Sequence, residues 1–98
     1  MRRGTTPTNT FTVDVDLRQA TAMYVTYKQG GTVLLEKTLE DITVSEDKIE
    51  VELSQEDTLA FKNGTVQIQI RAKFVDGSAL ASNIITVNMN AILKDGVI

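Results

Sequence analysis

The chain has 98 residues, of which 42% are hydrophobic and 23% are charged, and its formal net charge is −3. This length suits a single domain, and the composition is that of a folded globular protein. Cysteine and histidine are absent, which excludes the usual zinc sites, Ser-His-Asp triads and Cys-His pairs. The acidic balance leaves no basic stripe for nucleic acid, and no apolar run approaches the ~18 residues of a membrane span, so we expect neither as a partner.

The N-terminal segment is polar. Residues 1–9 contain no apolar side chain after Met1, and Pro7 among them cannot donate to a β-ladder. We therefore expect a flexible arm over residues 1–9, followed by a single β-sandwich domain over residues 10–98. Apolar and polar residues alternate from residue 11 to residue 17, which is the period of a half-buried strand and predicts the first strand there.

Two β-rich runs follow, at residues 21–28 and 32–39. The glycine pair between them, Gly30-Gly31, accepts positive φ and predicts a hairpin. The first run alternates cleanly. In the second run residues 33–35 are all apolar, so either both faces of that strand are covered or a bulge interrupts it.

A second hairpin is predicted from a short run at residues 42–44 and a longer alternating run at residues 48–53. Ser54 then begins a pattern like a capping box, with Asp57 in the place of the usual Glu. Such a pattern satisfies the first free amides of a helix. We expect a helix of at most two turns there, which Asn63-Gly64 ends.

The clearest strand is predicted at residues 66–74, where five apolar residues alternate with polar ones. A link of small residues at 78–81 precedes a last strand at residues 82–89. Short strands separated by turn signals are typical of an all-β fold. We predict an immunoglobulin-like antiparallel β-sandwich of about seven strands with one short helix in a connection; an open barrel is the structural alternative.

Carboxylates are the remaining candidates for chemistry. A glycosidase needs only two of them, but Glu50 and Glu52 fall on the polar side of one strand, and Asp14 and Asp16 on that of another. The loop acids at residues 40–41 and 46–47 lack the spacing of an EF-hand. We interpret all of these as solubilising charges, and we predict no catalytic residue, no metal site, no cofactor and no enzyme activity.

The C-terminal segment is apolar where chains usually become polar. Ile92, Leu93, Val97 and Ile98 follow a strand that already completes the predicted sandwich. Either this tail folds over its own core, or it adds to the sheet edge of a neighbouring subunit. Tyr24 and Tyr27 fall on opposite faces of one strand, so at least one is expected at the surface, and we include Tyr24 among the candidate interaction residues.

Nearly the whole chain resembles a family of small, uncharacterised structural proteins of prophages of Gram-positive bacteria. The resemblance lies in four segments: Met-Arg-Arg-Gly-Thr-Thr-Pro-Thr at residues 1–8, Tyr-Val-Thr-Tyr-Lys-Gln-Gly at 24–30, Leu-Ser-Gln-Glu-Asp-Thr-Leu-Ala-Phe at 53–61, and Leu-Lys-Asp-Gly-Val-Ile at 93–98. None of these is a catalytic signature.

The resemblance implies a non-enzymatic module that mediates subunit interaction in a virion, in the tail, the baseplate or the head decoration. Its expected partners are other virion structural proteins or a second copy of itself, as a homo-oligomer. It implies a cytoplasmic location in the bacterial host and a place in the virion once phage is assembled. A carbohydrate-binding or receptor-binding β-sandwich module is the alternative function.

Overall fold

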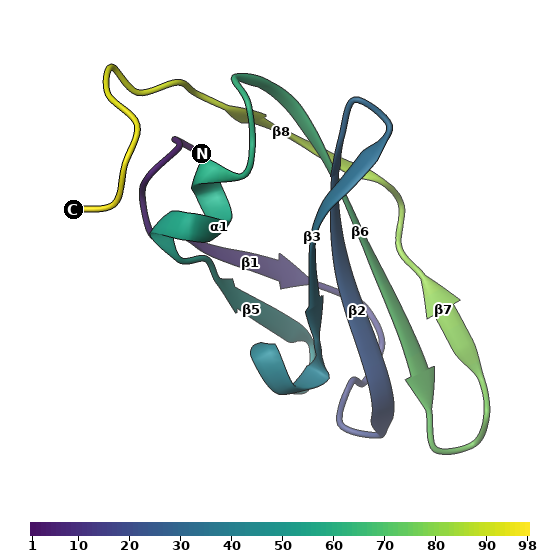
Figure 1. Cartoon of the computed structure of the whole chain (residues 1–98). Coiled ribbons are helices and arrows are strands. Elements are labelled where there is room, and N and C mark those ends of the chain that lie inside the picture. The colour runs from purple at the N-terminus through teal and green to yellow at the C-terminus, as the bar shows by residue number, and fades with distance from the viewer.

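A computed structural model describes residues 1–98 and contains eight strands, one short α-helix and one 3₁₀ turn (Figure 1). No helix in it has the length and apolar character that crossing a membrane would require. In chain order the elements are β1 (Thr8–Thr12), β2 (Ala20–Gln29), β3 (Thr32–Thr38), η1 (Leu39–Asp41), β4 (Thr43–Val44), β5 (Lys48–Glu52), α1 (Gln55–Leu59), β6 (Gly64–Phe74), β7 (Ala79–Ala81) and β8 (Ile85–Met89).

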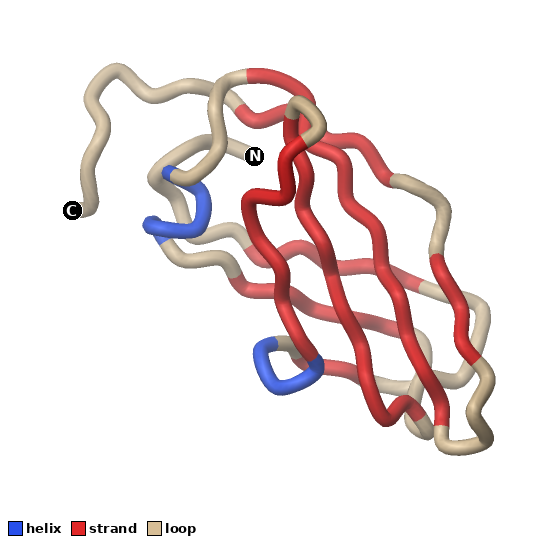
Figure 2. Tube along the Cα trace, turned by 45° about the vertical axis from the view of Figure 1, so that its right-hand side comes forward, coloured by secondary structure: helices blue, strands red, loops and turns tan.

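The strands form two antiparallel sheets (Figure 2). One sheet has the order β1-β5-β4, and the other has the order β3-β2-β6, with β7 and β8 both pairing with β6 on the side away from β2. If β1 is equated with strand B of an immunoglobulin domain, these sheets correspond to B-E-D and C′-C-F-G. The predicted immunoglobulin-like sandwich is thereby confirmed, with β7 and β8 as two pieces of one interrupted edge strand and no strand in the position of A.

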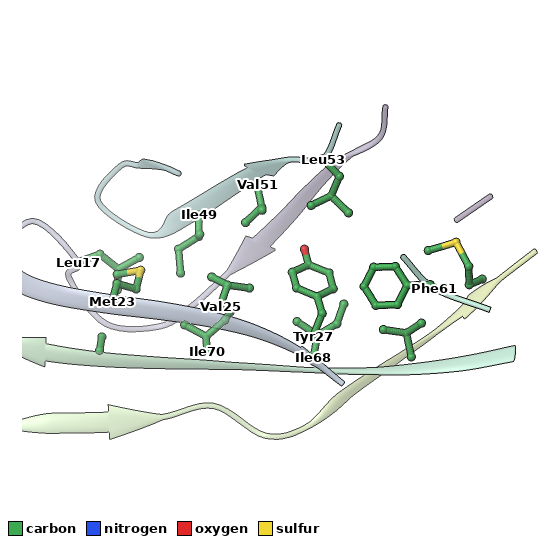
Figure 3. Packing of buried hydrophobic residues seen from close by; sticks show 13 residues of the cluster. Leu17, Met23, Val25, Tyr27, Ile49, Val51, Leu53, Phe61, Ile68 and Ile70 are labelled. Atoms are coloured by element: carbon green, nitrogen blue, oxygen red, sulfur yellow. The ribbon is translucent and has the colours of Figure 1, made fainter. Parts of the chain in front are cut away.

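The core lies between the two sheets (Figure 3). The inward side chains of β2, β5 and β6 alternate with exposed ones, as the sequence predicts for strands with one face in an apolar interior. Burying such side chains is the main source of stability. The thirteen core residues are Leu17, Met23, Val25, Tyr27, Ile49, Val51, Leu53, Phe61, Val66, Ile68, Ile70, Ala72 and Met89.

The irregularity predicted in the run at residues 32–39, which contains β3, is a bulge. The register of β2 against β3 shifts between Tyr27, which faces Leu35, and Lys28, which faces Val33, so Leu34 has no partner. One extra residue on one strand twists and bends the edge of a sheet. Of the two alternatives for this run, the bulge is therefore the one found.

The predicted helix α1 begins at the predicted cap. The Ser54 hydroxyl accepts a hydrogen bond from the Asp57 amide at 3.0 Å, and the Asp57 carboxylate accepts one from the Ser54 amide at 2.9 Å. This reciprocal pair satisfies two amides that a helix start leaves free. It holds a five-residue helix across one end of the sandwich.

The expectation of a loose arm over residues 1–9 differs from the structure. Met1 and Arg3 exchange main-chain hydrogen bonds with Asn90 at 2.7 and 2.9 Å, and a parallel bridge joins Arg2 to Asn90. The chain then crosses to the other sheet, where β1 begins at Thr8, inside the expected arm. The polar composition of residues 1–9 predicted a solvated segment, but main-chain pairing needs no apolar side chains. Composition therefore gave no sign of this pairing.

Two strand predictions need correction. The first strand ends at Thr12, although alternation continues to Leu17, because the Asp16 carboxylate accepts a hydrogen bond from the Arg18 amide at 2.9 Å and turns the chain toward β2. Val15 is consequently 40% exposed. The second correction concerns residues 78–81, where the predicted link contains the short strand β7.

Candidate interaction surfaces

The C-terminal tail, residues 91–98, lies beside α1 and the N-terminus and leaves the sandwich (Figure 1). Leu93 and Ile98 are fully exposed, at 109% and 105%, and Val97 is 54% exposed. Of the four, only Ile92 is half-buried. Its side chain packs closely on Gly4: a Cβ added to Gly4 would lie 3.0 Å from the Ile92 Cδ1. The four predicted tail residues are therefore not brought together over the core, and three of them point into solvent.

Polar contacts tether this tail. The Arg3 guanidinium pairs with the Asp95 carboxylate at 2.5 Å. The Gln55 side chain accepts a hydrogen bond from the Ile98 amide at 2.8 Å and donates one to the Ile98 main-chain oxygen at 3.4 Å. Through these contacts the backbone of the tail has a defined path while its apolar side chains stay uncovered.

Arg3 is the residue that sequence reasoning missed. Its side chain is only 17% exposed, and it donates to the main-chain oxygens of Phe61 at 2.5 Å and Leu59 at 3.0 Å. The last carbonyls of a helix have no partner within it, and a cation there also complements the helix dipole. A basic pair near a terminus gave no signal of this role, because the carbonyls lie far along the chain.

Tyr24 lies on the outer face of the larger sheet. It is 42% exposed and faces Arg71 directly across the β2–β6 ladder. A shallow hollow of about 260 Å³ beside it is lined mainly by apolar residues, among them Ala22, Ala79 and Leu80. Tyr27, on the opposite face of β2, is buried, so the expectation that at least one of the two tyrosines is exposed is confirmed.

A more polar cavity of about 520 Å³ lies next to α1, and Leu53 is the one apolar residue in its lining. Lys37 and Asp57 meet at its wall with Nζ and Oδ2 2.9 Å apart, and both side chains are 18% exposed. Burial raises the pKa of the Asp57 carboxyl, but the hydrogen bond from the Ser54 amide and the Lys37 ammonium outweigh it, so that pKa lies below its usual value. The Lys37 ammonium and the Asp57 carboxylate are therefore paired with each other.

The other carboxylates singled out from the sequence are exposed. Asp14 and Asp16 lie in the connection after β1, and Glu50 and Glu52 project from the outer face of β5. Asp16 pairs with Arg18, whose hydrogen bond lowers the pKa of the Asp16 carboxyl to about 2. No group of three or more acidic residues lies close enough together to hold a metal ion.

Neither a protein-family model, nor a curated protein, nor a solved structure matches this chain.

Proposed function

We propose that this chain is a non-enzymatic structural module of phage type that packs against other subunits of a virion, in the tail, the baseplate or the head decoration. One observation carries the proposal: the tail has a tethered backbone but presents Leu93, Val97 and Ile98 to solvent. Three exposed apolar side chains within six residues of a small domain are typical of a segment that a partner covers. The resemblance described above supports the virion setting.

The tether of the tail lowers the conformational entropy that is lost when a partner binds. A partner that docks on a free tail must order it, and the lost conformational freedom weakens the complex. Here the Arg3–Asp95 and Gln55–Ile98 contacts already restrict the backbone. A partner then gains the burial of the apolar side chains with less loss of entropy.

The test is incorporation into particles induced from a lysogenic bacterium that encodes this chain. A tagged wild-type chain should sediment with the particles. The double variant Leu93→Ser with Ile98→Ser should be incorporated at least about tenfold less, because these side chains supply apolar contact area. Its fold should be unchanged, since neither side chain is covered within the chain.

Val75→Ser is the matched control, because Val75 is 68% exposed but lies in the turn between β6 and β7, away from the tail. This variant should be incorporated like wild type. Particles that lack the chain altogether, or that take up the double variant as readily as wild type, would contradict the proposal.

Binding of a sugar or a receptor at Tyr24 is the second candidate. It is favoured by an exposed aromatic ring beside Arg71 and a hollow of about 260 Å³, because aromatic rings offer a flat apolar face with a polar edge. A glycan array probed with wild type and with Tyr24→Ala tests it. Absence of binding, or binding that survives Tyr24→Ala, would dismiss this candidate.

A further inference from the structure

The free edge of β1 has a defined hydrogen-bonding pattern. Main-chain bonds join Val13 to Asp47 at 2.8 Å and Leu53 to Pro7 at 2.9 Å, at the two ends of the β1–β5 ladder. In an antiparallel pair the hydrogen-bonded positions alternate, so Asn9 and Phe11 also turn their amides and carbonyls toward β5. The main-chain groups of Thr8, Thr10 and Thr12 consequently point away from the sheet.

Nothing else in the chain uses these groups. β1 pairs only with β5, and the amides and carbonyls of Thr8, Thr10 and Thr12 take part in none of the turn, loop or side-chain hydrogen bonds. All three residues are exposed, and Phe11 is only half-buried although it points inward. The edge therefore offers unpaired donors and acceptors next to an incompletely covered aromatic ring.

The other edges carry features that discourage pairing. β3 has the bulge at Leu34 together with the charged Glu36 and Lys37. β4 has two residues, and β7 has three. The end of β8 is covered by residues 1–3. Natural sheets protect their edges by charges, bulges, short strands and covering segments, and β1 has none of these along its five residues.

We propose that β1 is the site at which a second copy of this chain adds to the sheet, antiparallel and across a two-fold axis at Thr10. In that register Thr10 faces Thr10 of the second copy, and Thr8 faces Thr12, so every free group of one edge meets a free group of the other. Five residues without charge, Thr-Asn-Thr-Phe-Thr, bring no like charges together, and Thr-Thr pairs are favourable across strands.

This arrangement joins two three-stranded sheets into one continuous sheet and places the two Phe11 rings at the junction. A contact limited to one short strand is small, so the dimer is weak, with a dissociation constant of about 10 μM to 1 mM. The inference deepens the proposed function: it names a partner, a second copy, and an edge distinct from the tail.

Sedimentation equilibrium of the full-length chain at about 10 μM to 1 mM tests the proposal. Wild type should move from 10.8 kDa toward twice that mass as concentration rises. Thr10→Pro should raise the dissociation constant at least about tenfold, because proline removes an amide that only the second copy uses and is tolerated at a solvent-facing edge position. Leu93→Ser with Ile98→Ser should dimerise like wild type.

A pair of charge variants tests the register and does not depend on how proline is tolerated. Thr8→Lys with Thr12→Glu places opposite charges across the axis and should keep the dimer. Thr8→Lys with Thr12→Lys places like charges there and should raise the dissociation constant at least about tenfold, as like charges directly opposite each other disfavour pairing.

Amide exchange gives an independent readout. The amides of Thr8, Thr10 and Thr12 should become protected as concentration rises, whereas those of Asn9 and Phe11 should be protected at every concentration. Wild type that stays at 10.8 kDa up to about 1 mM would overturn the proposal. So would a dimer that the tail variant abolishes while Thr10→Pro and the like-charge variant leave it intact. Failure of particle incorporation alone would instead count against the proposed function.

Discussion

The Tyr27 hydroxyl donates a hydrogen bond to the Asn9 side-chain oxygen at 2.7 Å, and this bond links β2 in one sheet to β1 in the other. Tyr27 is fully buried, and its ring lies 6.0 Å from that of Phe61; Figure 3 shows the hydroxyl directed toward the smaller sheet. Burial raises the pKa of the Tyr27 phenol above its ordinary value, so the group stays a neutral donor at physiological pH.

Tyr27→Phe should lower the free energy of unfolding by about 1 to 2 kcal/mol, because it leaves the half-buried Asn9 without its donor. Urea titration followed by circular dichroism measures this. Tyr24→Phe is the control, since the Tyr24 ring is 42% exposed and its hydroxyl makes no hydrogen bond within the chain. Equal stability of the two variants would contradict the prediction.

Ile70→Ala should lower the free energy of unfolding by about 2 to 5 kcal/mol, because it opens a cavity among close-packed side chains. Ile70 is 1% exposed at the centre of β6. Ile84→Ala removes the same atoms at a position that is 58% exposed and should change stability by less than about 0.5 kcal/mol. Thermal melts of both variants provide the comparison, and a small effect at Ile70 would speak against the described core.

Arg3→Ala should lower the free energy of unfolding by about 1 to 3 kcal/mol, because the main-chain oxygens of Leu59 and Phe61 lose a charged donor. It should also release the tail by removing the partner of Asp95. Arg2→Ala is the control, since Arg2 is exposed and its side chain bonds only the Ala91 oxygen. Hydrogen exchange in α1 should accelerate for Arg3→Ala and not for Arg2→Ala; equal exchange in both would exclude the assigned role.

The Lys37–Asp57 pair predicts a dependence of stability on pH. The pKa of the Asp57 carboxyl is lower in the folded chain than its ordinary value of 3.8, so the unfolded chain binds the proton more readily. The stabilisation is therefore complete above pH 3.8 and is lost as the pH falls through the folded pKa.

Asp57→Asn should reduce the slope of unfolding free energy against pH in this acid range, because it removes the carboxyl whose pKa folding lowers. Part of the slope should remain, because Asp16, whose carboxyl has a pKa of about 2, titrates in the same range. Urea titrations at a series of pH values measure the slopes. An unchanged slope in Asp57→Asn would show that the pair does not contribute.

The sequence by itself determined the strands whose two faces differ. Alternation from Val66 to Ala72 sets the inward face of β6, and the Ser54 and Asp57 pair marks the start of α1. These features follow from interactions between residues a few positions apart, where strand and helix periods act directly. At Leu34 the local alternation breaks, so the sequence left two alternatives open, a strand covered on both faces or a bulge, and the structure has the bulge.

Only the tertiary structure decided where the termini lie and which main-chain groups remain free. Arg3 and Asp95 are 92 positions apart, and Met1 pairs with Asn90 through backbone groups that every residue has. No local pattern records such contacts, since they depend on how the sheets stack and on what is left unpaired afterwards. The same holds for the tail: composition indicates that Leu93 and Ile98 are apolar, but only the packed sandwich leaves them without a cover.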